Sequence, residues 1–431
     1  MKTIAFFVVL TIVLLFSAAC NEPYVPLVFR SEYTLADVAP RGTIAEAETN
    51  MLPLNLKIEV TNQELARHEP VSGAFLGAYI GRDRTLSGLR DFEAQTGVNH
   101  AMFVHTMVLG EDYPLRWVLE NIASAKAPFI VLKAPAELCF SDQGLFEQLR
   151  DFARDAGRFA VPVFVSIFPL LGEHSFLAGE YISFFRAARS VFKFYAPNVA
   201  MVWGFDADNL ADSVQFYPGR DAVDWIHLTA YNDICRNGNF RDFFAYLDFF
   251  YFLYQRERPL AVSTGVSHYS ADGNTYFVQA AAERIEYIFT RLYDYPRIKA
   301  VLLHSYNDLE DSGNKFRLHD VEAVVQAYRQ AAGHERFIDF VDNMHGHGGV
   351  RRANQVMRSP FRAFMMDAYF YVPLRALVYD MRLAQRHLDE LELKGNERVI
   401  NGEVFFSMID IHRVTGADIL VDFSRGWLML R

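Results

Sequence analysis

Short apolar runs alternate with longer segments of helical period through most of this chain, from Gly73 onward. An apolar run bounded by helices predicts a parallel strand that is buried on both faces of its sheet. Runs of this kind lie at Ala74–Ile80, His100–Val104, Phe129–Lys133, Val163–Phe168, Val199–Phe205, Trp225–Ala230, Leu260–Thr264 and Ala300–His304. The helices expected between them include Leu115–Ala125, Gly144–Ala156, Tyr181–Tyr195, Phe240–Gln255, Tyr276–Tyr293 and Val321–Ala332.

Eight strand–helix units over residues 73–333 predict an α/β fold of the (β/α)8 TIM-barrel type, which typically takes about 250 residues. An open, doubly wound sheet is the structural alternative. That fold would call for a phosphate-binding GxGxxG turn after an early strand, and Gly77–Gly81 does not supply one. We therefore expect a closed barrel.

The barrel is expected to carry additions at both ends. Residues 20–72 are predicted to be a tether and a small N-terminal extension, in which the alternation of Leu54–Val60 indicates one strand. Residues 334–431 are predicted to be a C-terminal α+β addition. There we expect helix over Ser359–Leu393, broken at Pro373, and then strands over Val399–Arg431. The aromatic-rich run Phe243–Tyr254 predicts a helix packed between the barrel and these additions.

The N-terminus predicts export and attachment to lipid. Lys2 precedes the apolar run Ile4–Phe16, and small residues lead to Cys20, so residues 1–19 are typical of a secretory signal peptide. The run is shorter than the ~20 apolar residues of a membrane span. Small residues directly before a cysteine resemble a bacterial lipobox, although an ordinary signal peptide with a chance cysteine is the alternative. We expect an exported protein held at a bacterial membrane through lipid on Cys20.

Charge and cysteine content exclude some classes of function. The formal net charge is −10, and nucleic-acid binding calls for a basic patch, so we expect no nucleic-acid partner. Cys139 and Cys235 are expected to stay unpaired, because they follow strands that lie far apart around a barrel. His345 and His347 in a glycine-rich loop are a weak metal signal without nearby carboxylates, and we expect no metal or cofactor.

Several stretches of the expected barrel are similar to one known family: Gly77–Tyr79, Phe92–Gly97, Trp203, Phe216–Ile226 (FYPGRDAVDWI), Leu228–Asn232 (LTAYN) and Ile298–Val301. They resemble glycoside hydrolase family 26, which contains β-mannanases and related endo-glycanases, and the resemblance extends from Gly73 to about Leu309. It implies a retaining glycosidase, in which two carboxyl groups about 5 Å apart act as acid/base and nucleophile.

The resemblance also implies where those carboxyl groups should lie. The acid/base position after the fourth strand holds Leu170, and the nucleophile position at the seventh strand holds Ser263 or Thr264. Leu170 cannot donate a proton, and a hydroxyl with no neighbouring base is a poor nucleophile toward an anomeric carbon. Glu173 and Asp206 could form a relocated pair; the alternative is that they cap helices and hold loops.

Side chains at the strand ends are candidates for contact with a polysaccharide or oligosaccharide: Trp203, Tyr217, Tyr231, Asn232, His268, His304 and Tyr306. Aromatic rings there could stack on sugars, whereas the histidines could equally be structural. Three functions follow. We favour a catalytically impaired pseudo-glycosidase that binds a glycan or a protein partner at the cell surface. An active endo-β-glycanase with relocated carboxylates is the second, and a structural lipoprotein with a plugged barrel is the third.

Overall fold

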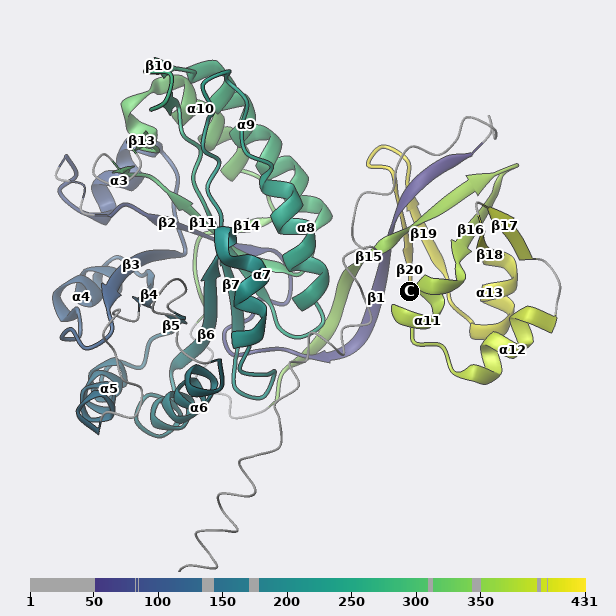
Figure 1. Ribbon diagram of the computed structural model, residues 1–431, viewed down its shortest axis with the longest axis horizontal. Helices are drawn as coiled ribbons and strands as arrows, with labels where there is room; N and C mark the ends of the chain where they lie inside the picture. The colour runs from purple at the N-terminus through teal and green to yellow at the C-terminus, as the bar shows by residue number, and fades with distance from the viewer. Residues whose placement is uncertain are drawn as a thin grey trace, which may run out of the picture.

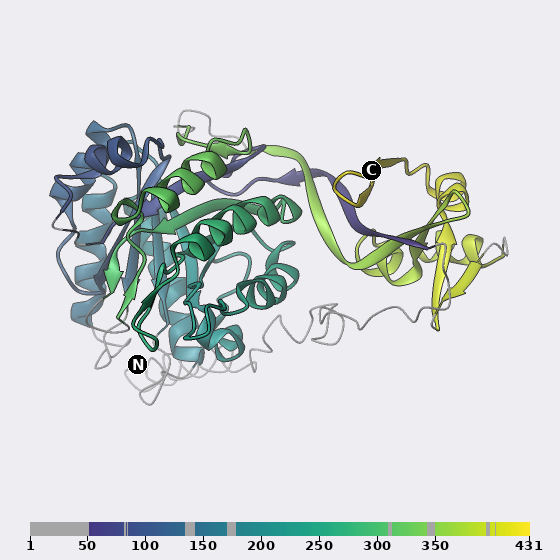
Figure 2. The same cartoon turned by 90° about the horizontal axis from the view of Figure 1, so that it is seen from above.

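The computed structural model describes residues 51–81, 83, 85–133, 143–169, 178–308, 313–342, 350–393, 397–400 and 402–431. A large barrel domain and a smaller second domain lie side by side, and two long strands run from one into the other (Figures 1 and 2). Within the described residues, no helix is both long enough and apolar enough to cross a membrane.

The larger domain is a closed parallel barrel. Its strands follow chain order around the barrel, and the last one pairs with the first, from Ala300 opposite Phe75 to His304 opposite Tyr79. The strands are β2 (Ala74–Tyr79), β3 (Met102–Val108), β4 (Ala127–Lys133), β5 (Val163–Phe168), β6 (Val199–Asp206), β7 (Trp225–Thr229), β8 (Leu260–Thr264) and β11 (Ile298–His304). The expected TIM barrel is confirmed, and each of its eight strands overlaps the predicted run.

Helices cover the outside of the barrel, and an apolar cluster fills the layer between helices and strands. The helices are α3 (Leu89–Thr96), α4 (Leu115–Ala123), α5 (Gln143–Ala156), α6 (Ala178–Tyr195), α7 (Leu210–Ser213), α8 (Phe243–Tyr254), α9 (Val278–Arg291) and α10 (Glu322–Ala332). Local signals fix several of their ends. The Asp242 side chain accepts a hydrogen bond from the Ala245 amide and caps α8, and Gly97 adopts the left-handed conformation (φ 67°) that ends α3.

The barrel interior is a packed core rather than a channel. Phe129, Phe164 and Trp225 stack and pack edge-on inside it. The end at which the strands begin is closed by the segment before β2, where the Trp225 indole N–H donates to the Arg67 carbonyl at 2.7 Å. The opposite end, where the strands finish, is the end at which TIM barrels place their chemistry.

The second domain is built on a seven-stranded sheet in the order β17–β18–β16–β15–β1–β20–β19. Its strands are β1 (Leu52–Glu64), β15 (Arg352–Met366), β16 (Tyr369–Pro373), β17 (Glu397–Ile400), β18 (Glu403–Ser407), β19 (Ile419–Asp422) and β20 (Trp427–Leu430). The helices α11 (Leu374–Tyr379), α12 (Gln385–Leu393) and α13 (Met408–Thr415) contribute with the sheet to a separate apolar core. α11 and α13 each begin directly after the second strand of a hairpin.

Three features of this domain differ from the sequence analysis. One of them is α13, a helix within Val399–Arg431, where strands were expected. The helix expected over Ser359–Leu393 is wrong at its start, because β15 continues to Met366 and β16 follows it. β15 forms because it pairs antiparallel with β1, and every second side chain from Gln355 to Ala363 is buried. β1 also pairs with β20, so residues 52–64 and the C-terminal addition share one sheet.

Buried polar contacts fix the second domain to the end of the barrel where the strands begin. Arg297, directly before β11, is ion-paired with Glu69 at 2.5 Å and donates to Gln355 of β15 at 2.8 Å. The Gln255 side chain, after α8, exchanges two hydrogen bonds with the Arg358 backbone. The second domain therefore lies at the end of the barrel where the strands begin. It does not cover the opposite end, where the strands finish.

Candidate functional site

The C-terminal ends of the barrel strands bring together inward-facing polar and aromatic side chains. Side chains alternate between the interior and the exterior along a strand, so the inward apolar residues identify the others with the same parity. Beyond the inward core residues of β2, β4, β6, β7 and β11 lie Tyr79, Lys133, Asp206, Tyr231 and His304, with Tyr306 two residues further on. These residues form the barrel mouth.

Three tyrosines surround one buried histidine at the mouth. Ring centroids of Tyr79 and Tyr231 lie 5.0 and 4.8 Å from His304, and both approach it edge-on. Tyr306 lies 5.0 Å from Tyr79, and its hydroxyl is hydrogen-bonded to that of Tyr231. The three tyrosines are half-buried, whereas His304 is 6 % exposed. We call Tyr79, Tyr231, His304 and Tyr306 the mouth cluster.

A second histidine lies deeper in the barrel. Nε2 of His227 is 2.7 Å from the Ser263 hydroxyl oxygen, and each of these side chains is 1 % exposed. Phe129 and Phe168 present ring edges or faces to the imidazole at centroid distances of 5.2 and 5.5 Å. Burial lowers the pKa of His227 to about 3, so it is neutral at physiological pH.

The same reasoning holds for His304. Its pKa is lowered to about 3, mainly by burial and further by the neighbouring His227 and the Lys133 ammonium. The uncharged imidazole carries one hydrogen-bond donor and one acceptor. Its Nδ1 atom is buried and has no hydrogen-bond partner among the described residues.

Asp206 supplies a carboxyl group to the mouth. It is the one carboxylate at an inward position on the eight described barrel strands. Burial raises its pKa, Asp208 adds to that rise, and the Lys133 ammonium opposes it. A single carboxyl group with a raised pKa can donate a proton, but it is not the pair that a retaining glycosidase uses.

Strand parity separates Ser263 from Thr264, the two residues that the resemblance offers for the nucleophile position. Ser263 faces the interior of the barrel, and Thr264 faces outward and accepts a hydrogen bond from the Asn232 amide at 2.9 Å. Asn232 in turn accepts from Arg284 of α9 at 2.9 Å and is fully buried. Both polar atoms of the Asn232 side chain thus join the segments of β7, β8 and α9, and its contact with a ligand stays a prediction.

Two aromatic candidates lie away from the mouth cluster. Trp203 and Tyr217 are buried in the layer outside the barrel, where their ring centroids lie 5.0 Å apart and both pack against Tyr254. Trp203 follows the inward Val202 by one residue and therefore points outward. His268, which follows β8, is buried beside Tyr276 rather than in the mouth cluster.

The remaining predicted positions lie outside the described residues: Cys20, Cys139, Leu170, Glu173, His345 and His347. Cys235 is described and carries an exposed free thiol. Across the described parts of the chain, no group of three histidine, cysteine, aspartate or glutamate side chains is arranged to hold a metal ion.

The structure adds residues that sequence reasoning missed as site residues: Tyr79, Lys133, His227 and Phe316. Period-two alternation would have found His227, because it follows the inward Trp225 by two residues. Tyr79 and Lys133 stand at the ends of correctly predicted strands. Phe316 lies after β11, and its ring centroid is 5.3 Å from that of Tyr231. No pattern in the neighbouring sequence predicts this contact.

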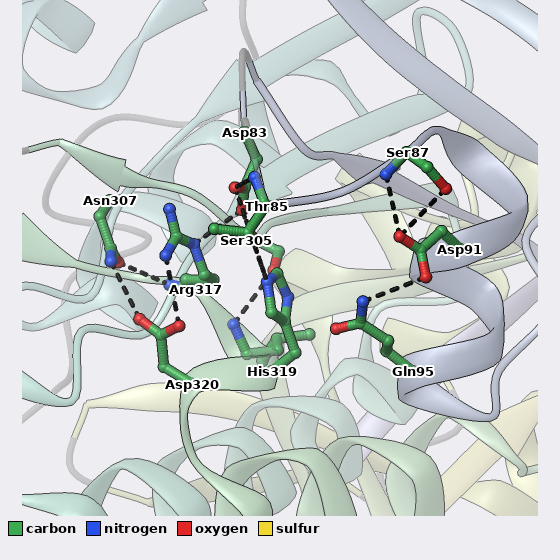
Figure 3. Close-up of polar contacts among 11 residues, drawn as sticks. Asp83, Thr85, Ser87, Asp91, Gln95, Ser305, Asn307, Arg317, His319 and Asp320 are labelled. Carbon is green, nitrogen blue, oxygen red and sulfur yellow. Dashed lines mark hydrogen bonds and ion pairs between the residues drawn. The ribbon is translucent and has the colours of Figure 1, made fainter.

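A network of polar contacts holds the loop that carries Tyr306 and Phe316 (Figure 3). Asp83, after β2, has a fully buried side chain that lies 2.7 Å from the Arg317 guanidinium. Asp83 also accepts from the Thr85 amide and hydroxyl. Asn307 donates to Asp320 at 3.0 Å and accepts from the Arg317 amide at 3.1 Å. The loops after β2 and β11 are thereby joined beside the mouth.

Comparisons with known proteins gave structural likenesses at low identity. No family model matches the chain, and no curated protein matches it. A GH26 β-mannanase from Bacteroides ovatus is 13 % identical over 65 % of this chain and 92 % of its own, with a TM-score of 0.45. A GH113 β-1,4-mannanase is 11 % identical over 60 % of this chain and 99 % of its own, with a TM-score of 0.42. Fungal β-1,4-galactanases are 10 % identical over 60 % of this chain and 99 % of their own, with a TM-score of 0.45.

Proposed function

We propose that this chain is a membrane-anchored lipoprotein whose barrel binds a polysaccharide or oligosaccharide at its mouth and does not cleave it by double displacement. One observation carries the proposal. The mouth cluster presents three half-buried tyrosine rings around a neutral histidine, and Asp206 is the one inward carboxylate on the described strands. On the described strands, aromatic and polar groups gather at the mouth, and no second inward carboxylate accompanies Asp206.

The chemistry of the mouth suits a sugar. A pyranose ring has an apolar face of C–H groups that packs against an aromatic ring, and hydroxyl groups around its edge. Ligand sites of this kind combine aromatic surface with a few placed polar groups. Here Tyr79, Tyr231 and Tyr306 supply the surface, and Asp206 and His304 supply acceptors and donors for sugar hydroxyls.

The nucleophile position supports the loss of hydrolysis. Ser263 is almost fully buried, and its hydroxyl is engaged with His227. A nucleophile must reach the anomeric carbon, and this hydroxyl lies beneath the side chains that form the mouth. Leu170, at the acid/base position, has no group that could protonate a leaving oxygen.

An active endo-β-glycanase is the second candidate, and the environment of Asp206 favours it. A general acid needs a carboxyl group that is protonated near the working pH, and burial raises the pKa of Asp206 in that direction. Glu173 would have to act as its partner for this function.

Affinity electrophoresis tests the proposal directly. The soluble chain from residue 21 onward is run through gels that contain galactomannan, glucomannan or mixed-linkage β-glucan. We expect at least one polysaccharide to retard the protein, and the Tyr231→Ala/Tyr306→Ala double variant to run as it does without polysaccharide. Retardation of the double variant equal to that of the parent would refute a role for the mouth cluster.

A further inference from the structure

Two short hairpins extend from the mouth end of the barrel beside the mouth cluster. β9 (Tyr269–Ser270) and β10 (Thr275–Tyr276) follow β8, and β12 (Asn307–Asp308) and β13 (Asn314–Lys315) follow β11. β10 and β13 both lie at the upper left of the barrel domain in Figure 1, and β13 contacts β9. The two hairpins therefore form one surface.

That surface holds an ordered group of aromatic rings around a cation. The Lys315 ammonium lies 4.1 Å from the ring centroid of Tyr269 and 4.5 Å from that of Tyr276, and it donates to the Tyr276 hydroxyl. The two tyrosine centroids are 4.9 Å apart. Tyr276 is nevertheless 55 % exposed. We call Tyr269, Tyr276 and Lys315 the hairpin platform.

The platform is held in place by its own hydrogen bonds. The Tyr269 hydroxyl donates to Asn274 at 2.6 Å, and the Ser267 hydroxyl donates to the Tyr269 carbonyl at 2.7 Å. The His268 amide donates to the Lys315 carbonyl at 3.0 Å and so ties the two hairpins together. Rings fixed in this way lose little conformational entropy when a ligand lands on them.

The platform is continuous with the mouth cluster. Phe316 follows Lys315 directly, its ring packs against Tyr231, and its amide donates to the Tyr306 carbonyl at 3.3 Å. Lys315 thus contacts the platform rings while its chain neighbour contacts the mouth cluster. Two successive residues of one segment therefore connect the hairpin platform to the mouth cluster.

We propose that the hairpin platform is a second saccharide subsite and that the ligand is an oligosaccharide or polysaccharide chain long enough to cover both groups. One sugar unit lies at the mouth cluster, and a unit further along the chain packs against Tyr276. Lys315 is a positioning residue that holds the two rings. This inference rests on the proposed function of the mouth cluster.

A chain-length series tests the inference. The polysaccharide that best retards the protein is cut by mild acid, and fractions from disaccharide to hexasaccharide are titrated by calorimetry. We expect Tyr276→Ala to weaken binding of the hexasaccharide by roughly three- to tenfold, the worth of one aromatic contact, and to leave the disaccharide unchanged. Lys315→Met should weaken the same long ligands. Tyr369→Ala is the matched control, because Tyr369 is 50 % exposed on β16 of the second domain.

Equal effects of Tyr276→Ala on short and long chains, or none on either, would overturn the platform subsite and leave the mouth cluster standing. If the unmodified protein binds no glycan, the proposed function fails and the platform fails with it. Lys315→Met serves as the second variant if Tyr276→Ala lowers the melting temperature.

Discussion

The Ser263 hydroxyl oxygen and Nε2 of His227 lie 2.7 Å apart inside the barrel, shielded from water. In the family that the sequence resembles, the neighbourhood of Ser263 should supply the attacking carboxylate. Here it supplies one half of a buried neutral hydrogen bond. The pair stabilises the barrel interior where a retaining glycosidase would carry charge.

Ser263→Ala tests that structural role. It leaves the His227 Nε2 atom buried without its partner, and the other ring nitrogen already has none among the described residues. We expect a loss of roughly 1–3 kcal/mol in the free energy of unfolding, measured by urea denaturation. A Ser263→Ala/His227→Phe double variant that remains less stable than Ser263→Ala would show that the loss does not come from the orphaned imidazole.

The two buried histidines predict a dependence of stability on pH. Their folded-state pKa values are lowered to about 3, whereas the unfolded chain binds protons near the ordinary value of 6.5. The unfolded state therefore binds more protons between these limits, and stability falls as pH falls from about 6.5 toward 3. Carboxylates titrate in part of this range, so the informative quantity is the difference between the parent and His304→Gln.

Urea midpoints at pH 7, 5.5 and 4.5 measure that difference. We expect a shallower decline for His304→Gln, because one group that must bind a proton on unfolding has been removed. A decline as steep as that of the parent would mean that His304 is charged, or solvated, in the folded protein.

The junction between the domains contains a buried ion pair whose loss should be costly. Arg297 and Glu69 are both almost fully buried. Glu69→Gln removes the charge that balances the guanidinium, and we expect a loss of about 3–5 kcal/mol. Asp221→Asn, which breaks the exposed pair with Arg186, should cost less than about 1 kcal/mol. Thermal unfolding of both variants measures the two losses of stability. Equal losses for Glu69→Gln and Asp221→Asn would contradict the larger effect expected for the buried pair.

Lipid attachment predicts where the protein is found. Cys20→Ser should abolish incorporation of labelled fatty acid and move the protein from the membrane fraction to the soluble exported fraction. Retention of Cys20→Ser in the membrane fraction would show that another feature holds the protein there.

The barrel could be predicted from the sequence because local patterns of apolar residues determine its strands and helices. Eight apolar runs bounded by helices were enough to predict a closed barrel. The region around Pro360 could not be read in the same way. Its strand, β15, is stabilised by pairing with β1, which lies about 300 residues earlier in the chain, and such long-range pairing overrides local preference.

The site was predictable only in part, because strand parity decides which side of the barrel a side chain faces. Asp206, Tyr231, His304 and Tyr306 were found from their places at strand ends. Trp203 was expected at the mouth because it lies near the end of β6, but it is one residue out of phase with Val202 and faces the helices. Phe316 lies outside the barrel strands, next to Arg317, whose guanidinium is paired with Asp83.

Release of reducing ends is the most direct test of a glycan-binding barrel without double-displacement hydrolysis. The soluble protein is incubated with the polysaccharide that retards it, beside Asp206→Asn and Glu173→Gln controls. We predict that all three samples release the same background of reducing ends, although the parent binds the polysaccharide. Reducing ends from the parent that clearly exceed those from either control would contradict the account.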